Sequence, residues 1–217
     1  MARAAMKPEY GPTLGRILAP RWRAASTRAR AGIIAALLAA LAVLVAAALT
    51  LENSSYTHSG AVPFSFSYRD LYSVSPEPGG YVRVQAHGPD GQLKYSFAVN
   101  PLVLPPYTGE VAAELPIYAS RYIHRLESAR TDFKLVGEGF ARTSLHGLPG
   151  YEVLYTTTVG GREIYGRDML LLPPGPSTVR AGVSIVMLSE PSGQITSPLK
   201  VASTGVLAHP LKTFSWG

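Results

Sequence analysis

The sequence contains no cysteine in its 217 residues. Without cysteine there is no disulfide to hold an exported fold together, and no thiol to which a membrane-anchoring lipid can be attached. The folded part of the chain therefore has to be stabilised by packing and hydrogen bonding alone.

Charged residues are also scarce, at 16% of the sequence, whereas hydrophobic residues make up 47%. An intrinsically disordered chain shows the opposite balance, with much charge and little apolar material. The composition therefore excludes a disordered protein. The length leaves room for one ordinary domain and an extension, and it excludes a large multidomain protein.

The net charge of +6 comes entirely from the start of the chain. Residues 1–30 hold seven basic residues and one acidic residue, and residues 31–217 hold 13 of each. A nucleic-acid-binding protein concentrates lysine and arginine on its folded domain. The electrically balanced remainder of this chain therefore argues against nucleic acid as a partner.

Residues 31–51 contain no charge and consist of nine Ala, six Leu, two Ile, two Val, one Gly and one Thr. As a helix they would span roughly 30 Å, the thickness of the hydrocarbon core of a bilayer. The segment predicts one transmembrane helix in contact with membrane lipid. The predicted anchor positions are Trp22 at the interface and Ile33, Leu37, Leu41, Leu44 and Leu49 in the span.

The basic residues before this segment predict its orientation. By the positive-inside rule, residues 1–30 form a cytoplasmic tail, and residues 61–217 form an extracytoplasmic domain after a polar linker at 52–60. The protein is then a single-pass plasma-membrane protein. A signal peptide cleaved near Ala46-Ala47-Ala48 is the alternative, but the long basic leader and the long apolar run favour a retained anchor.

Alternation of apolar and polar residues predicts seven strands beyond the linker. They cover residues 64–68, 81–86, 93–99, 133–143, 151–159, 162–172 and 179–188. Residues 110–130 have helical spacing and predict one amphipathic helix that Pro116 opens at its first turn. A short helix is expected at 197–207 and a tail at 211–216. The fold class is therefore α+β, an antiparallel sheet of six to seven strands flanked by helices.

Four stretches carry a resemblance to a known fold: VPFSFSYRDLYSV, YSFAVNPL, GLPGYEVLYTTTVGGREIYGRDMLLLP and GVLAHPLKTFSW. Together they resemble the PsbP-like family, whose fold is shared with the Mog-type Ran-binding proteins and many small bacterial exported proteins. The resemblance covers about residues 60–217. It implies an α/β/α sandwich that serves as a binding or assembly module and has no catalytic residues to transfer.

This sequence departs from the family in two respects. Many bacterial relatives are lipoproteins, but no lipobox cysteine is present here. The plant proteins associate with a photosystem, and no residue of this sequence supports such an association.

The stretch HGLPGYEVLYTTTVGG, residues 146–161, admits two interpretations, a phosphate-binding loop or a strand that enters a turn. A phosphate loop is followed by a helix, whereas the residues after this stretch have a strand pattern. A two-residue Gly160-Gly161 loop suits a type I′ turn. The stretch therefore predicts a hairpin in which facing residue numbers sum to 321, so that Gly166 lies opposite Tyr155 and leaves room for its ring.

The same register places Asp168 on the apolar side of the hairpin. A buried carboxylate is costly without a partner. We therefore expect an arginine or several backbone N–H groups beside it, and Arg142 and Arg180 are candidates. Glu152 and Arg167 point to the other face, where they are expected to form a cross-strand pair.

The candidate binding residues are polar side chains of this hairpin and of the segment before it: Arg142, His146, Tyr165, Arg167 and Asp168. An exposed loop histidine is the simpler interpretation of His146, and a structural role is the simpler interpretation of Asp168. The outer face of the predicted helix carries Arg121, His124 and Arg125. It is either a solvated surface or a contact for an acidic partner or an anionic envelope polymer.

Motifs for catalysis and for metal binding are missing from the sequence. The five histidines are scattered singly, with no HExxH pair. There is no GxSxG elbow for a serine nucleophile, and Ser184 lies within a regular strand pattern. We therefore expect no catalytic residues, no cofactor and no metal.

The expected function is that of a non-enzymatic, membrane-anchored binding or assembly module that contacts a partner protein or an envelope component. An envelope hydrolase or transferase with an unrecognised site is one alternative, and it predicts a deep pocket with a perturbed carboxylate near Asp168. A small-ligand sensor with residues 1–30 as its cytoplasmic output is another.

The predicted orientation can be tested with protease added to intact cells. Because the domain is expected outside the membrane, the protease should cut beyond Gly60 and leave residues 1–30 protected, as read from tags at the two ends of the chain. Protection beyond Gly60 would contradict the orientation. A freely soluble chain that starts near Leu49 would contradict the retained anchor.

Overall fold

The computed structural model describes residues 26–51, 53–106, 111–140, 150–174 and 180–217. The chain divides into two compact units, Met1–Leu51 and Glu52–Gly217.

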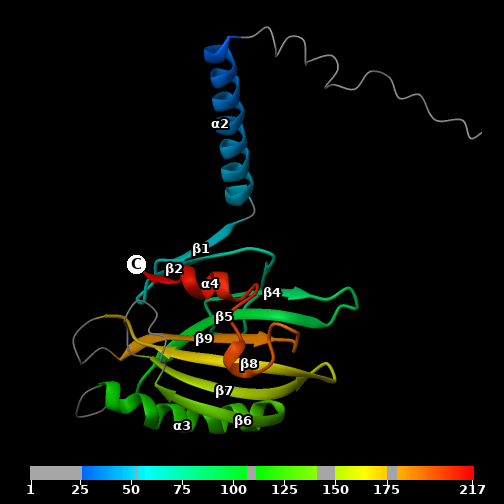
Figure 1. Cartoon of the computed structure of the whole chain (residues 1–217). Helices are drawn as coiled ribbons and strands as arrows, with labels where there is room; N and C mark the ends of the chain where they lie inside the picture. Colours follow the sequence, from blue (N-terminus) through cyan, green and yellow to red (C-terminus); the bar gives the residue numbers. More distant parts are fainter. Residues whose placement is uncertain (1–25, 52, 107–110, 141–149, 175–179) are drawn as a thin grey trace, which may run out of the picture. The chain divides into compact units, whose positions relative to one another are not determined.

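The described part of the first unit is α2, Thr27–Leu51, an uninterrupted helix of 25 residues (Figure 1). Its segment Thr27–Val45 has a mean hydropathy of 2.0 and no buried residue, so its length and composition suit a membrane span. Four of the predicted anchor side chains are exposed on this helix: Ile33, Leu37, Leu41 and Leu44. Leu49 also belongs to α2, whereas Trp22 lies outside the described residues.

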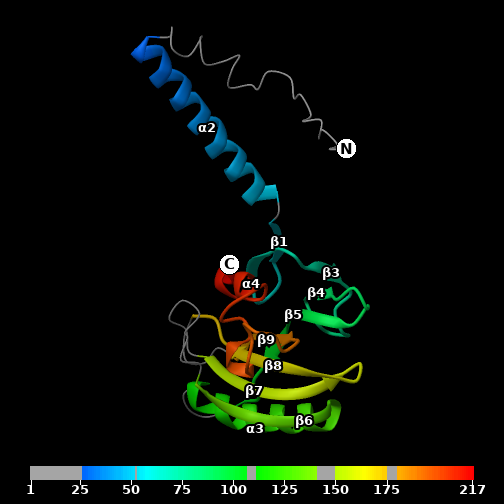
Figure 2. The ribbon, with the colours of Figure 1, turned by 45° about the vertical axis from the view of Figure 1, so that its right-hand side comes forward.

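The second unit is built on a seven-stranded antiparallel sheet with the strand order β3-β4-β5-β9-β8-β7-β6 (Figure 2). Its strands are β3 Tyr72–Val74, β4 Val82–His87, β5 Leu93–Val103, β6 Thr131–Phe140, β7 Gly150–Val159, β8 Arg162–Leu171 and β9 Ala181–Ser189. Strands β4 to β9 are those that the alternation predicts, and the short edge strand β3 was not expected. The α+β class and the antiparallel sheet are confirmed.

A second, three-stranded sheet has the order β1-β2-β10 and consists of β1 Ser54–His58, β2 Phe64–Tyr68 and β10 Ser215–Trp216. The predicted strand at 64–68 is therefore present but belongs to this smaller sheet. The linker expected at 52–60 and the tail expected at 211–216 are wrong, because both contain strands that pair with β2. Edge strands such as β1 gain backbone hydrogen bonds without needing an apolar face, so composition alone did not reveal them.

Helix α3, Val111–Ala129, confirms the amphipathic helix expected at 110–130. Its buried apolar side chains follow helical spacing: Leu115, Ala119, Ile123 and Leu126. Pro116 lies inside the helix, more than one turn after Val111, and not in the first turn as predicted. It supplies no N–H to the carbonyl four residues earlier. Burial of the surrounding apolar side chains against the sheet offsets that loss.

The C-terminal segment contains η2, a 3₁₀ turn at Pro198–Lys200, and α4, a short helix at Ala208–Thr213. The single helix expected at 197–207 is therefore wrong. Ala202 has a φ of 58° and Gly205 a φ of 74°, and both values lie outside the α-helical region. The α-helix forms only after these two residues, where a tail was expected.

The two faces of the large sheet carry separate hydrophobic clusters. One face packs against α3 and includes Tyr155 and Leu170. The opposite face packs against β2 and against the segment 195–214, and the ring centroids of Phe66 and Phe97 lie 5.0 Å apart there. Figures 1 and 2 show α3 beside β6 and β7, and α4 beside β2 at the other end of the domain.

The hairpin of β7 and β8 has the predicted register, with Tyr155 opposite Gly166 and Val153 opposite Asp168. Both loop glycines have positive φ, 59° at Gly160 and 79° at Gly161, as a type I′ turn requires. A Cβ atom added to Gly166 would overlap the Tyr155 ring. The absence of a side chain at Gly166 therefore makes room for this fully buried tyrosine.

Gly166→Ala should destabilise the protein by about 1–3 kcal/mol, the usual cost of overpacking a filled core. Urea unfolding of the full chain in detergent, followed by tryptophan fluorescence, measures the change. Gly139→Ala in β6 is the matched control, because nothing lies within 4 Å of its added Cβ atom. Equal effects of the two substitutions would contradict the role of Gly166.

Candidate functional site

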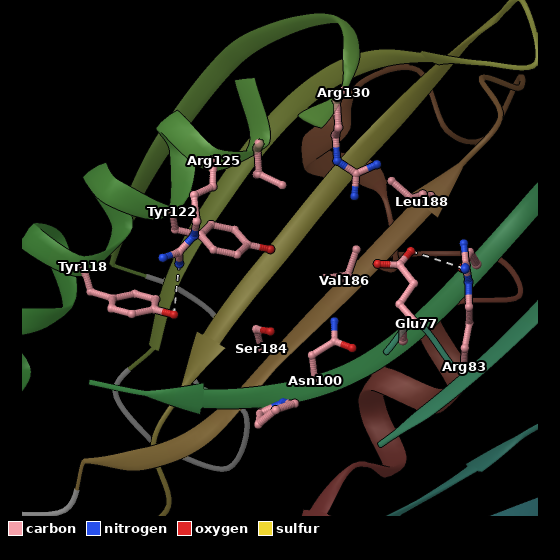
Figure 3. A pocket seen from close by; sticks show the side chains of 14 residues that line it. Glu77, Arg83, Asn100, Tyr118, Tyr122, Arg125, Arg130, Ser184, Val186 and Leu188 are labelled. Atoms are coloured by element: carbon pink, nitrogen blue, oxygen red, sulfur yellow. Dashed lines mark hydrogen bonds and ion pairs between the residues drawn. The ribbon is translucent and has the colours of Figure 1, made fainter. Parts of the chain in front are cut away.

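The candidate site is a pocket on the face of the large sheet that carries α3 (Figure 3). Helix α3 packs on β6 and β7, so the part of the same face formed by β9, β5 and β4 lies beside the helix and not beneath it. The pocket has a volume of about 320 Å³. This is within the range of small-molecule sites, about 300–1,000 Å³.

The floor of the pocket comes from alternate residues of two paired strands. Ser96, Ala98 and Asn100 of β5 lie opposite Leu188, Val186 and Ser184 of β9. Successive side chains of a strand point to opposite faces, so Phe97 and Val99 fill the core on the other side. The alternation that buries β5 on one face therefore leaves small and polar side chains on the pocket floor.

The wall of the pocket comes from α3 and the residue after it. Tyr118, Tyr122 and Arg125 are three or four positions apart and thus share one face of the helix. Arg125 donates a hydrogen bond to the Tyr118 hydroxyl at 3.1 Å, and its guanidinium lies 5.3 Å from the Tyr118 ring centroid and 5.8 Å from that of Tyr122. These contacts position the Arg125 guanidinium at the pocket. Arg130 completes the wall after the helix ends.

The opposite side of the pocket carries an ion pair between Arg83 of β4 and Glu77, which precedes that strand. The N–O distance is 3.3 Å. Both side chains are visible across the floor from Arg130 in Figure 3. The pocket therefore has charged groups on both sides and hydroxyl and amide groups between them.

Asp168 lies next to this pocket, under α3. In the sheet it faces Val186 of β9, which in turn faces Ala98 of the pocket floor. Asp168 is fully buried and accepts hydrogen bonds from the hydroxyls of Tyr122, at 2.7 Å, and Tyr155, at 3.1 Å. The buried carboxylate thus bonds directly to Tyr122, a residue of the pocket wall.

Burial raises the pKa of Asp168 from 3.8 to about 6, although Arg130, the two tyrosine hydroxyls and a backbone hydrogen bond from Met187 oppose the rise. Desolvation, together with the nearby Asp168 charge, also holds the pKa values of Tyr122 and Tyr155 well above 10. Burial by itself would lower the pKa of Arg130, but its Coulombic interactions with Tyr155 and Asp168 dominate and raise it. Arg130 is therefore charged throughout the physiological range.

The raised pKa of Asp168 couples protonation to stability. Because the folded-state pKa of about 6 exceeds the unfolded value near 3.8, the protonated carboxyl favours the folded state. This contribution is complete below pH 3.8 and is lost as the pH rises through about 6. The neighbouring hydroxyls and Arg130 limit the loss by stabilising the carboxylate.

An arginine is present beside Asp168, as expected, and the described residues supply one that was not among the two candidates. Arg180 donates to the backbone carbonyl of Pro105 at 2.9 Å, and Arg142 lies outside the described residues. The charged partner is Arg130. The signal that sequence reasoning missed is Tyr122, because a tyrosine on the buried side of a helix needs a hydrogen-bond partner for its hydroxyl.

Tyr165 and Arg167 lie on the opposite face of the sheet from Asp168. Arg167 and Glu152 form the expected pair, with N–O distances of 2.9 and 3.1 Å, but the pair is buried. Arg167 also donates to the carbonyl of Val201 and thereby ties β8 to the C-terminal segment.

The candidate binding residues therefore do not form one site. Tyr165 and Arg167 belong to the face that packs on the C-terminal segment, Asp168 belongs to the α3 face, and Arg142 and His146 are outside the described residues. One residue of the pocket lining, Arg125, belongs to the outer helix face for which the sequence allowed two interpretations, a solvated surface or a contact for an acidic partner or an anionic envelope polymer.

No family model and no curated protein matches the chain. Among solved structures, it is similar to cyanobacterial PsbP (CyanoP) from Synechocystis sp. PCC 6803, with a TM-score of 0.51 over 76% of this chain and 93% of that chain at 12% identity. The chain has a PsbP-like fold. The resemblance of the four sequence stretches is thereby confirmed at the level of fold.

Two further structures are similar to this PsbP-like chain. LpqN of Mycobacterium tuberculosis, described as involved in cell envelope biogenesis, has a TM-score of 0.49 at 9% identity and covers 76% of this chain and 91% of that one. PA94 of Pseudomonas aeruginosa, a protein of unknown function, has a TM-score of 0.36 at 15% identity and covers 64% and 84%.

In this PsbP-like domain the buried carboxylate contacts a residue of the pocket wall and does not itself line the pocket. Both oxygens of Asp168 accept tyrosine hydroxyls, and Asp168 is not among the residues that line the pocket. A general acid or base must reach its substrate within hydrogen-bond distance. Among the described residues, no three His, Asp or Glu side chains are grouped to hold a metal ion.

Tyr122→Phe should raise the pKa of Asp168 further above 6, because the hydrogen bond from the Tyr122 hydroxyl stabilises the carboxylate. A ¹³C-carboxyl NMR titration of the aspartate-labelled full chain measures the midpoint. Tyr118→Phe is the matched control, since the Tyr118 hydroxyl contacts Arg125 and not Asp168. An unchanged midpoint in Tyr122→Phe, or an equal rise in both variants, would show that this bond does not act on Asp168.

Proposed function

We propose that the protein is a single-pass membrane protein whose extracytoplasmic PsbP-like domain works as a non-enzymatic binding module. The pocket beside α3 holds a polar group of a partner protein or of an envelope component. The observation that carries the proposal is the pocket itself, a hollow with serine and asparagine side chains on its floor and charged residues on both sides.

The membrane anchor is supported by α2 and by the charges before it. The helix exposes large apolar side chains from Ile33 to Val45, which a water-soluble helix does not do without a partner. Seven basic residues within positions 1–30 favour a cytoplasmic N-terminus. Helix α2 ends at Leu51 and β1 begins at Ser54, so the connection to the domain is short. Such a tether raises the concentration of the domain at the membrane surface.

A binding role is supported by the way the pocket is built. Its wall residues are fixed by contacts within the domain, since Tyr122 bonds to Asp168 and Arg125 bonds to Tyr118. Binding to a preformed site avoids the entropy cost of ordering its side chains. The pocket is therefore organised before any ligand arrives.

An envelope hydrolase is the second candidate, because a carboxyl group with a pKa of about 6 lies next to a pocket. The enclosure of Asp168 argues against it, since the carboxylate does not face the pocket space. A binding module needs Asp168 only as a hydrogen-bond acceptor that fixes Tyr122, and this is the role that its contacts describe.

Photo-crosslinking in cells tests the binding role. A photoreactive phenylalanine analogue in place of Tyr118, in the pocket wall, should give a discrete cross-linked product whose mass identifies a protein or an envelope component. The same analogue in place of Tyr165 is the control, because Tyr165 packs against the cluster on the opposite face of the sheet.

Filling the pocket sharpens the experiment. Ala98→Trp places a bulky side chain on the floor and should abolish the cross-link from position 118 while the protein still accumulates in the membrane. No cross-link at position 118, or one that persists when the floor is filled, would contradict the proposed use of the pocket.

A further inference from the structure

The charged residues that line the pocket are unbalanced. Three arginines, Arg83, Arg125 and Arg130, face a single carboxylate, Glu77. Glu77 pairs with Arg83 at 3.3 Å on the β4 side. On the α3 side, Arg130 has the buried carboxylate of Asp168 near it, so the positive charge left over among the lining residues is centred on Arg125.

Arg130 has a donor that no group of the described residues satisfies. Its Nε atom is buried and has no hydrogen-bond partner there. The nearby Asp168 already accepts both tyrosine hydroxyls. A buried donor without a partner costs free energy, and Figure 3 shows the Arg130 guanidinium projecting from the wall toward the pocket. The outer nitrogens of this guanidinium, and not the buried Nε, are the donors that an acceptor in the pocket can meet.

Arg125 is placed to take part in the same interaction. Its guanidinium is stabilised by the ring faces of Tyr118 and Tyr122 and by one hydrogen bond to the Tyr118 hydroxyl. None of the ion pairs among the described residues includes Arg125. A guanidinium carries five N–H donors, so most of those of Arg125 are open to a ligand.

We propose, building on the binding role above, that this pocket takes a ligand with an anionic group, a phosphate or a carboxylate, bound between Arg125 and Arg130. Guanidinium groups match the geometry of both anions and form charge-assisted hydrogen bonds with them. Ser96, Ser184 and Asn100 on the floor supply hydroxyl and amide groups for the polar remainder of the ligand. The volume of about 320 Å³ admits a small molecule or a head group and exceeds the needs of a bare ion.

NMR of the arginine side chains tests the proposal on the full chain in zwitterionic detergent. With ¹⁵N-arginine, glycerol phosphate and succinate are titrated separately at constant ionic strength, with glycerol as the neutral probe. The Nε–Hε signals of Arg125 and Arg130 should shift and saturate with at least one anion and not with glycerol. Arg162 is the internal control, because it pairs with Asp90 and Glu190 away from the pocket.

Two variants separate a site from a general effect of charge. Arg125→Gln should weaken anion binding about tenfold, the size expected for one charge-assisted hydrogen bond. Arg162→Gln removes the same charge elsewhere and should leave the affinity within about twofold. Equal weakening by both variants, or no saturable shift up to about 20 mM anion, would overturn the proposal, since even weak binding at the millimolar level is visible there.

The source of the anion is decided by a second comparison. If the anion is the head group of an anionic lipid, nanodiscs of phosphatidylglycerol should shift the two arginine signals without added ligand, and nanodiscs of zwitterionic phosphatidylcholine should not. If the anion is a soluble molecule, neither lipid should shift the signals until the soluble anion is added. A cross-link at position 118 without any anion-dependent shift contradicts the anion assignment and leaves the binding module standing. Saturable shifts without a cross-link in cells support the anion site and contradict the proposed partner contact.

Discussion

One helix cannot cover a seven-stranded sheet, and this constraint shapes the rest of the domain. An α-helix with its side chains is about 10–12 Å wide, and neighbouring strands are about 4.8 Å apart, so α3 covers roughly two or three strands. It packs on β6 and β7 at one side of the sheet. The other side of that face has to be filled by something else or left open, and here it forms the pocket.

The open side of the face is stable because its residues suit an uncovered position. β5 and β9 place two serines, an alanine and an asparagine there, beside Val186 and the buried Leu188. Other large apolar residues of the two strands, such as Phe97 and Ile185, lie on the opposite face under β2 and the C-terminal segment. Small and polar side chains lose little when water reaches them. The domain therefore keeps a hollow on one face without exposing a hydrophobic patch.

Asp168 connects the covered and uncovered parts of the face. It stands in a cross-strand row with Val186 and Ala98, and it bonds to Tyr122 of α3. With Arg130 and Tyr155 it forms a buried polar cluster that fixes α3 against the sheet. Tyr122 and Arg130 also line the pocket. A change in the protonation state of Asp168 therefore changes the contacts of two residues of the pocket wall.

The local pattern of the sequence determined strand β2, strands β4 to β9, the amphipathic helix and the register of the β7–β8 hairpin. Side-chain alternation and the Gly160-Gly161 turn are properties of neighbouring residues, whereas the short strands β1, β3 and β10 left no such pattern. The local pattern also determined that Asp168 would be buried. Only the tertiary structure decided its partners. Tyr122 lies 46 positions before Asp168 in the sequence, and β6 and β7 separate Arg130 from Asp168. The pocket likewise depends on which strands α3 covers, and that is a long-range packing choice that no local period encodes.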